Sequence, residues 1–138
     1  MSTERIDYTG KPFSDLPFVY RRKRGKVDNS DWAVEPTTDY LHACTMGRRY
    51  AAHFLQWMKQ SGNCLGCELN FILSDMAPTL ARPRNDDDAT HGYAVGFVAH
   101  LERFIRHGAA SVDVWGDLER EEARAARVRA EYAEGGEA

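Results

Sequence analysis

The residues of this sequence whose types and spacing best suit chemistry are its three cysteines. Cys64 and Cys67 are separated by two residues, one of which is Gly66, and Cys44 lies twenty residues before Cys64. Two thiolates at this spacing can hold zinc from one turn of the chain, and a third cysteine with a histidine would complete four ligands. The sequence therefore contains the ligands for a zinc-binding regulatory module that uses Cys44, Cys64 and Cys67.

The nearest histidines do not complete this zinc site. On a helix, His42 lies about 200° around the axis from Cys44, and His53 lies about 180° from it. Both imidazoles therefore point away from the thiol, and the fourth ligand would have to be His91 or His100. Cys44 also falls in an apolar stripe, where a small buried cysteine is common. We expect reduced thiols and no cofactor, and we keep zinc as the alternative.

Other catalytic patterns are incomplete as well. A redox Cys-x-x-Cys follows a β-strand in a βαβ unit, whereas this one follows a predicted helix and a glycine turn. Zinc deaminases, to which this cysteine pattern has a partial likeness, need a glutamate where Cys44 stands and a proline where Asn63 stands. The sequence also lacks G-x-x-x-x-G-K-[ST], G-x-S-x-G and H-E-x-x-H. We therefore expect a protein that is not an enzyme.

A block of positive charge near the N-terminus is the best candidate for a binding surface. Residues 21–26 read RRKRGK, and aromatic residues lie on both sides of them. Cationic and aromatic side chains together suit phosphates, exposed bases or acidic protein patches. The alternative is a sheet edge that charge keeps from pairing, although five charges exceed that need. We predict a partner-binding surface made of Tyr20, Arg21, Arg22, Lys23, Arg24, Lys26 and Trp32.

The charge of the chain is distributed unevenly. The net charge is −3, and residues 111–138 carry eight acidic and four basic side chains. An acidic end of this kind would repel a nucleic-acid backbone, so general coating of DNA is disfavoured while a local basic contact is not. Direct nucleic-acid binding through the RRKRGK block therefore stays as an alternative function.

The elements that must position these residues are predicted to be mainly α-helical. The chain has 138 residues, 43% of them hydrophobic, which suits a single domain with its own core. No run approaches the ~20 apolar residues that a membrane span needs. We expect a compact bundle of about four helices, with these ranges: 37–61, 64–76, 90–107, and 113 or 117 to 132.

The chain ends are expected to be less regular than this bundle. Short alternating pieces around Phe18 and Trp32 predict a small N-terminal β-hairpin. The predicted organisation is one domain, 1–138, composed of an irregular or hairpin segment over 1–35, a helical core over 36–133 and a frayed tail over 134–138.

The first helix has the clearest pattern. Thr37 or Thr38 is its expected N-cap, because a hydroxyl there can accept from a free amide of the first turn. Gly62 is its expected end. Apolar and small residues recur at alternating steps of four and three and so share one face: Tyr40, Cys44, Gly47, Ala51, Phe54 and Met58.

Glycines and prolines delimit the later helices. Pro78 is expected to end the second helix and Gly108 the third. Gly92 and Gly96 lie four residues apart, which predicts a close approach by another backbone. The last helix has only a narrow apolar stripe, which would suit a homodimer as well as a core: Leu118, Ala125, Val128 and Tyr132.

These observations favour a binding protein over an enzyme. We expect an adaptor or inhibitor of a protein or nucleoprotein partner, using the basic block and the acidic C-terminal helix. Small proteins of phages and mobile elements often act in this way, including anti-CRISPR-like antagonists of host-defence complexes. The reduced thiols and the lack of a signal or membrane segment favour the cytoplasm, without a membrane partner.

Overall fold

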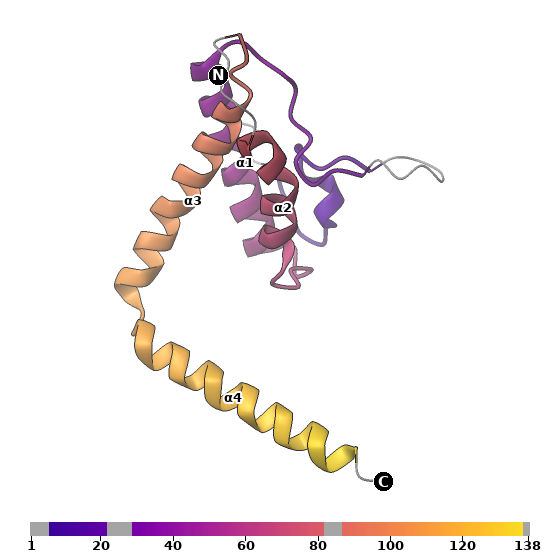
Figure 1. Ribbon diagram of the computed structural model, residues 1–138, viewed down its shortest axis with the longest axis vertical. Coiled ribbons are helices and arrows are strands. Elements are labelled where there is room, and N and C mark those ends of the chain that lie inside the picture. Colours follow the sequence, from indigo (N-terminus) through magenta and orange to yellow (C-terminus); the bar gives the residue numbers. More distant parts are fainter. Residues whose placement is uncertain (1–5, 22–28, 82–86, 137–138) are drawn as a thin grey trace. The chain divides into compact units, whose positions relative to one another are not determined.

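The computed structural model describes residues 6–21, 29–81 and 87–136 (Figure 1). Over these residues the protein is mainly α-helical, which confirms the predicted fold class. A short 3-10 helix, η1, covers Phe13–Asp15, and four α-helices follow. They are α1 (Tyr40–Gln60), α2 (Glu68–Ala81), α3 (His91–Ser111) and α4 (Val114–Gly135).

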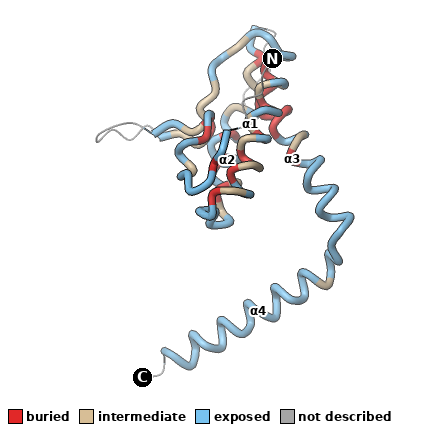
Figure 2. The backbone as a smooth tube through the Cα atoms, turned by 180° about the vertical axis from the view of Figure 1, so that it is seen from behind, coloured by how far each residue is buried: buried red, intermediate tan, exposed pale blue. Residues whose placement is uncertain are grey.

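The chain divides into two compact units, Met1–Leu101 and Glu102–Ala138, and the boundary falls within α3. The first unit contains the hydrophobic core, whereas no residue of α4 in the second unit is buried (Figure 2).

The core of the first unit is built around a close crossing of α1 and α3. A Cβ atom on Gly47 would overlap the carbonyl oxygen of Tyr93, and one on Gly96 would overlap that of Cys44. Only glycine lets the two backbones come this near. The close approach predicted at Gly92 and Gly96 is therefore confirmed, and Gly47 on α1 is its counterpart.

This crossing decides which face of α1 is buried. The buried face is centred on Gly47 and includes Ala43 and Trp57, which the predicted stripe omitted. Tyr40 and Met58, which the stripe included, are instead 43% and 37% exposed. The predicted face was thus rotated by part of a turn, because the contact point on α3 sets the orientation of α1.

The N-terminal segment contributes more to the core than its irregular sequence indicates. Tyr8, Leu16 and Phe18 are all buried in the cluster formed by the helices. The segment is also tied to α1, since the Trp57 indole donates to the carbonyl oxygen of Lys11 at 2.9 Å. The hydroxyl of Tyr8 lies 2.8 Å from Nδ1 of His53.

Several helix ends differ from the predictions. Asp39, and not a threonine, caps α1 by accepting from the amide of His42. The second helix begins at Glu68 instead of Cys64 and continues through Pro78. Proline there removes a single donor near the helix end, so the helix still closes three residues later.

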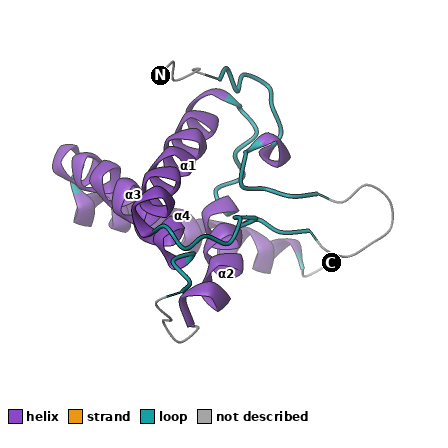
Figure 3. Cartoon of the chain, turned by 90° about the horizontal axis from the view of Figure 1, so that it is seen from above, coloured by secondary structure: helices purple, strands orange, loops and turns teal. Residues whose placement is uncertain are grey.

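The third helix runs through Gly108 to Ser111, because nothing at Gly108 requires a left-handed turn. The last helix begins after Asp113, whose side chain accepts from the amide of Gly116. No regular strand occurs in the described parts of the chain, where only helix and loop are drawn (Figure 3).

Candidate partner-binding site

The two ends of the basic segment are held together by one antiparallel bridge. The amide of Tyr20 donates to the carbonyl of Ser30 at 2.8 Å, and the amide of Ser30 donates back at 3.0 Å. Next to it, the amide of Ala33 donates to the carbonyl of Phe18 at 2.7 Å. The pairing expected of a hairpin is therefore present at its base.

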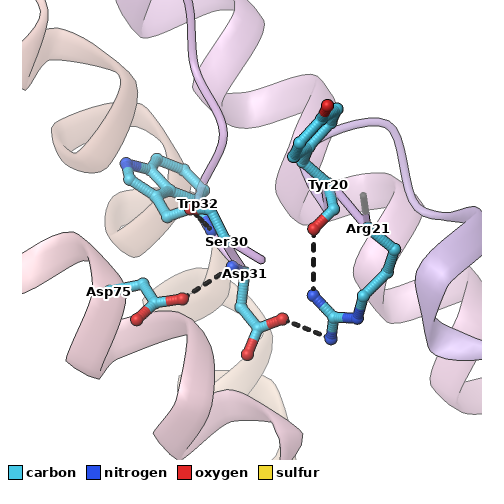
Figure 4. Close-up of polar contacts among 6 residues, drawn as sticks. All are labelled: Tyr20, Arg21, Ser30, Asp31, Trp32 and Asp75. Carbon is cyan, nitrogen blue, oxygen red and sulfur yellow. Dashed lines mark hydrogen bonds and ion pairs between the residues drawn. The ribbon is translucent and has the colours of Figure 1, made fainter. Parts of the chain in front are cut away.

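Side chains reinforce this base (Figure 4). The guanidinium of Arg21 lies 2.6 Å from a carboxylate oxygen of Asp31, and it also donates to the carbonyl of Tyr20 at 3.2 Å. The amide of Asp31 donates to the carboxylate of Asp75 at 2.6 Å. Because Asp75 belongs to α2, the base of the segment is fixed to the helical core.

Trp32 anchors the same base by packing its side chain into the hydrophobic core. Its side chain is only 5% exposed, and its ring lies 5.5 Å from that of Phe18 and 5.0 Å from that of Phe97. The pair with Phe97 is edge-to-face and that with Phe18 is tilted, and aromatic contacts of this kind add to the burial of the rings. Trp32 was predicted to contact a partner, but it lies in the core, so the surface proposed below is built without it.

Two of the predicted contact residues are described at the surface. Tyr20 is 48% exposed and the side chain of Arg21 is 38% exposed. Part of the charge of Arg21 is already compensated by Asp31, so its first role is to close the base. The other predicted contacts lie outside the described residues: Arg22, Lys23, Arg24 and Lys26.

The paired cysteines lie in a loop that Glu68 organises. The buried Glu68 carboxylate accepts from three consecutive amides, those of Leu65 at 2.6 Å, Gly66 at 3.0 Å and Cys67 at 3.1 Å. Burial raises the pKa of Glu68, but the hydrogen-bond donors outweigh it and hold the pKa below its ordinary value. The Glu68 carboxylate thus ties the backbone of the cysteine loop to the start of α2.

The thiols themselves do not assemble into a reactive centre. All three are free; Cys64 is exposed, and Cys44 and Cys67 are half-buried. Burial, together with the neighbouring Glu68, raises the pKa of Cys64 despite a backbone hydrogen bond at Gly66, which disfavours the thiolate that metals and nucleophilic chemistry require. In the described ranges, no group of three or more His, Cys, Asp or Glu residues is placed to hold a metal ion.

The histidines considered as zinc ligands lie in environments that differ from one another. His53 contacts the hydroxyl of Tyr8, and the ring of His91 lies 5.4 Å from that of Tyr40. His42 is exposed on the first turn of α1. The structure thus distributes these side chains over separate environments.

Sequence reasoning did not find Glu68, Asp31 or Asp75. The only available signal for Glu68 was its position directly after the Cys-x-x-Cys pair, where an acidic side chain can accept from amides at a helix start. Asp31 and Asp75 are 44 residues apart, and no spacing pattern connects them.

The second unit presents a different surface. No residue of α4 is buried (Figure 2), and Trp115 and Tyr132 are 75% and 80% exposed. Its first half is acidic, and Arg120 there lies 3.7 Å from Asp117. Among the described residues, none of the helices combines the length and the apolar character needed to cross a bilayer.

Comparisons with protein-family models, with curated proteins and with solved structures find no match for this chain. A functional proposal therefore depends on the residues themselves.

Proposed function

We propose that this is a non-enzymatic binding protein, an adaptor or inhibitor that contacts an acidic or phosphate-bearing macromolecular partner through residues 20–26. The observation that carries the proposal is the construction of the segment's base. The Tyr20–Ser30 bridge, the Arg21–Asp31 ion pair and the link to Asp75 all lie at the point where the basic segment enters and leaves the fold.

A fixed base matters for binding because it holds the two ends of the segment, at residues 20–21 and 30–31, in place before a partner arrives. Ordering a free loop on binding costs free energy, and fixing its ends beforehand lowers that cost. The segment concentrates five positive charges in six positions. Arginine and lysine in this density attract phosphates or carboxylates and accelerate encounter with an oppositely charged surface.

Within this class we favour an inhibitor of a nucleoprotein complex, such as a host-defence antagonist encoded by a phage or mobile element. The supporting feature is charge separation: the basic segment suits contact with nucleic acid or an acidic groove, while the acidic first half of α4 suits a nucleic-acid-binding surface. Expression in cells with an active nuclease-based defence should restore plaque formation by a targeted phage. Unchanged plaque numbers against several such systems would contradict this narrower proposal.

The broader proposal is tested with a variant that leaves the base intact. Arg22, Lys23, Arg24 and Lys26 are changed to Ser, whereas Arg21 keeps its ion pair with Asp31. The matched control changes four exposed basic residues elsewhere, Lys59, Arg103, Arg106 and Arg127, so that the total charge is the same. The segment variant should lose partners that the control retains in affinity capture from a source-cell lysate.

Direct binding to nucleic acid is distinguished by its dependence on salt. Filter binding of a random-sequence duplex and a single strand should weaken steeply with salt if phosphates are contacted, with a slope of about −0.9 per phosphate on duplex DNA. A protein partner with an acidic patch would give capture without such binding. A zinc-dependent function is not proposed, because no observation on the thiols favours it.

A further inference from the structure

The second unit has an apolar stripe that nothing in that unit covers. Val114, Leu118, Val128 and Tyr132 lie along one side of α4 and are 56%, 42%, 44% and 80% exposed. Helices in water gain most of their stability from packing an apolar face, and isolated ones are marginal. A stripe of this kind on a 22-residue helix indicates a docking surface.

Glu121 lies within this stripe, and two further charged residues lie along one edge of it without a counter-charge at helix spacing. Glu122 and Arg129 are seven residues apart, which places them about 20° apart around the helix axis. The positions three and four residues from Arg129 hold only Ala125, Ala126, Tyr132 and Ala133. The positions three and four residues from Glu122 hold no basic residue and include Glu119. Other arginines of α4 do have such partners, as the Arg120–Asp117 pair shows.

We propose that α4 pairs with the α4 of a second copy of this chain, antiparallel and centred on Ala125. In this register Leu118 of one copy lies level with Tyr132 of the other, because they are seven residues before and after Ala125. Glu122 and Arg129 are three before and four after it, so they come within about 1.5 Å of the same level along the axis. Each copy thereby supplies the counter-charge that the other lacks.

Ala125 suits the centre of such a pair because its small side chain permits close contact between the helices. The antiparallel direction follows from the charges. In a parallel, in-register pair Glu122 would face Glu122 and Arg129 would face Arg129, which is unfavourable. The antiparallel pair instead forms two identical Glu122–Arg129 contacts related by a two-fold axis, as expected for an isologous dimer.

This inference is independent of the proposed function, because it uses no residue of the basic segment. The test is charge reversal in the full-length protein, followed by light scattering and sedimentation equilibrium over a dilution series. Glu122→Arg and Arg129→Glu should each raise the dimer dissociation constant by at least about tenfold, because each places like charges opposite one another twice. The double variant Glu122→Arg/Arg129→Glu should restore the parental constant, because it reforms both pairs with exchanged signs.

Arg127→Glu is the matched control, since it makes the same charge change on the opposite side of α4 and should leave the dimer intact. Circular dichroism of each variant verifies that the helix content is retained. A parental chain that is monomeric throughout the series would overturn the proposal. A dimer that is insensitive to either single reversal, or that the double reversal does not restore, would also overturn it, because association would then use another surface or direction.

Discussion

The crossing of α1 and α3 makes a sharp prediction for Gly96→Ala. The added Cβ would overlap the carbonyl oxygen of Cys44, which is a backbone atom and cannot rotate out of the way. The helices must therefore separate, and overpacking of this kind costs about 1–3 kcal/mol or more. Replacing glycine with alanine inside a helix returns up to about 1 kcal/mol. We expect a net loss of about 1–2 kcal/mol.

The same helix provides the control. At Gly108 a Cβ would have no atom within 4 Å, so Gly108→Ala should cost nothing or stabilise by up to about 1 kcal/mol. Urea unfolding monitored by tryptophan fluorescence reports on the core, because Trp32 and Trp57 are buried there. If Gly96→Ala unfolds at the same urea concentration as the parent, the described contact between α1 and α3 is wrong.

Four further predictions concern the N-terminal attachments, the cysteine loop and the base of the basic segment. The pKa of Glu68 is lowered in the folded protein, so its carboxylate contributes stability at pH values above 4.5, the ordinary pKa of glutamate. This stability is lost as the pH falls through the folded pKa, and Glu68→Gln should flatten that part of a profile of urea stability against pH. Burial, and secondarily Arg49, lowers the pKa of His53, so stability should also decline as the pH falls below 6.5, and His53→Gln should remove this decline. Asp75→Ala removes the acceptor for the Asp31 amide and should weaken partner capture severalfold while the helix content measured by circular dichroism stays unchanged. Elemental analysis of the purified protein should find well under one equivalent of zinc, whereas stoichiometric zinc with protected thiols would contradict the description of free cysteines.

The sequence predicted the helices wherever periodicity was strong. α1 and α3 were found because their apolar residues recur at helical spacing, α4 was found despite its narrow apolar stripe, and Gly96 marked the close crossing. The burial of Tyr8 and Phe18 was not predictable in this way, because an irregular segment has no period and its packing depends on distant helices. The core was therefore larger at its N-terminal end than the sequence indicated.

The charges of the candidate site could be predicted from the sequence, but the contacts that fix the base of the basic segment could not. The RRKRGK block is visible in the sequence, whereas the Asp31–Asp75 contact joins residues far apart along the chain. Trp32 was assigned to the surface because it flanks the RRKRGK block. The alternation of apolar and polar residues around it does not show which face of the two-stranded base its side chain occupies. Contacts with Phe18 and Phe97 decide that it lies inside.

The role of the basic segment in binding is decided by comparing partner capture by the two charge-matched variants. The parental chain, the segment variant at residues 22, 23, 24 and 26 and the control variant are each immobilised at equal density, and captured proteins and nucleic acids are quantified against the parent. The control should retain the parental partner while the segment variant loses it. Equal capture by both variants, or loss only with the control, would contradict a partner-binding role for the basic segment.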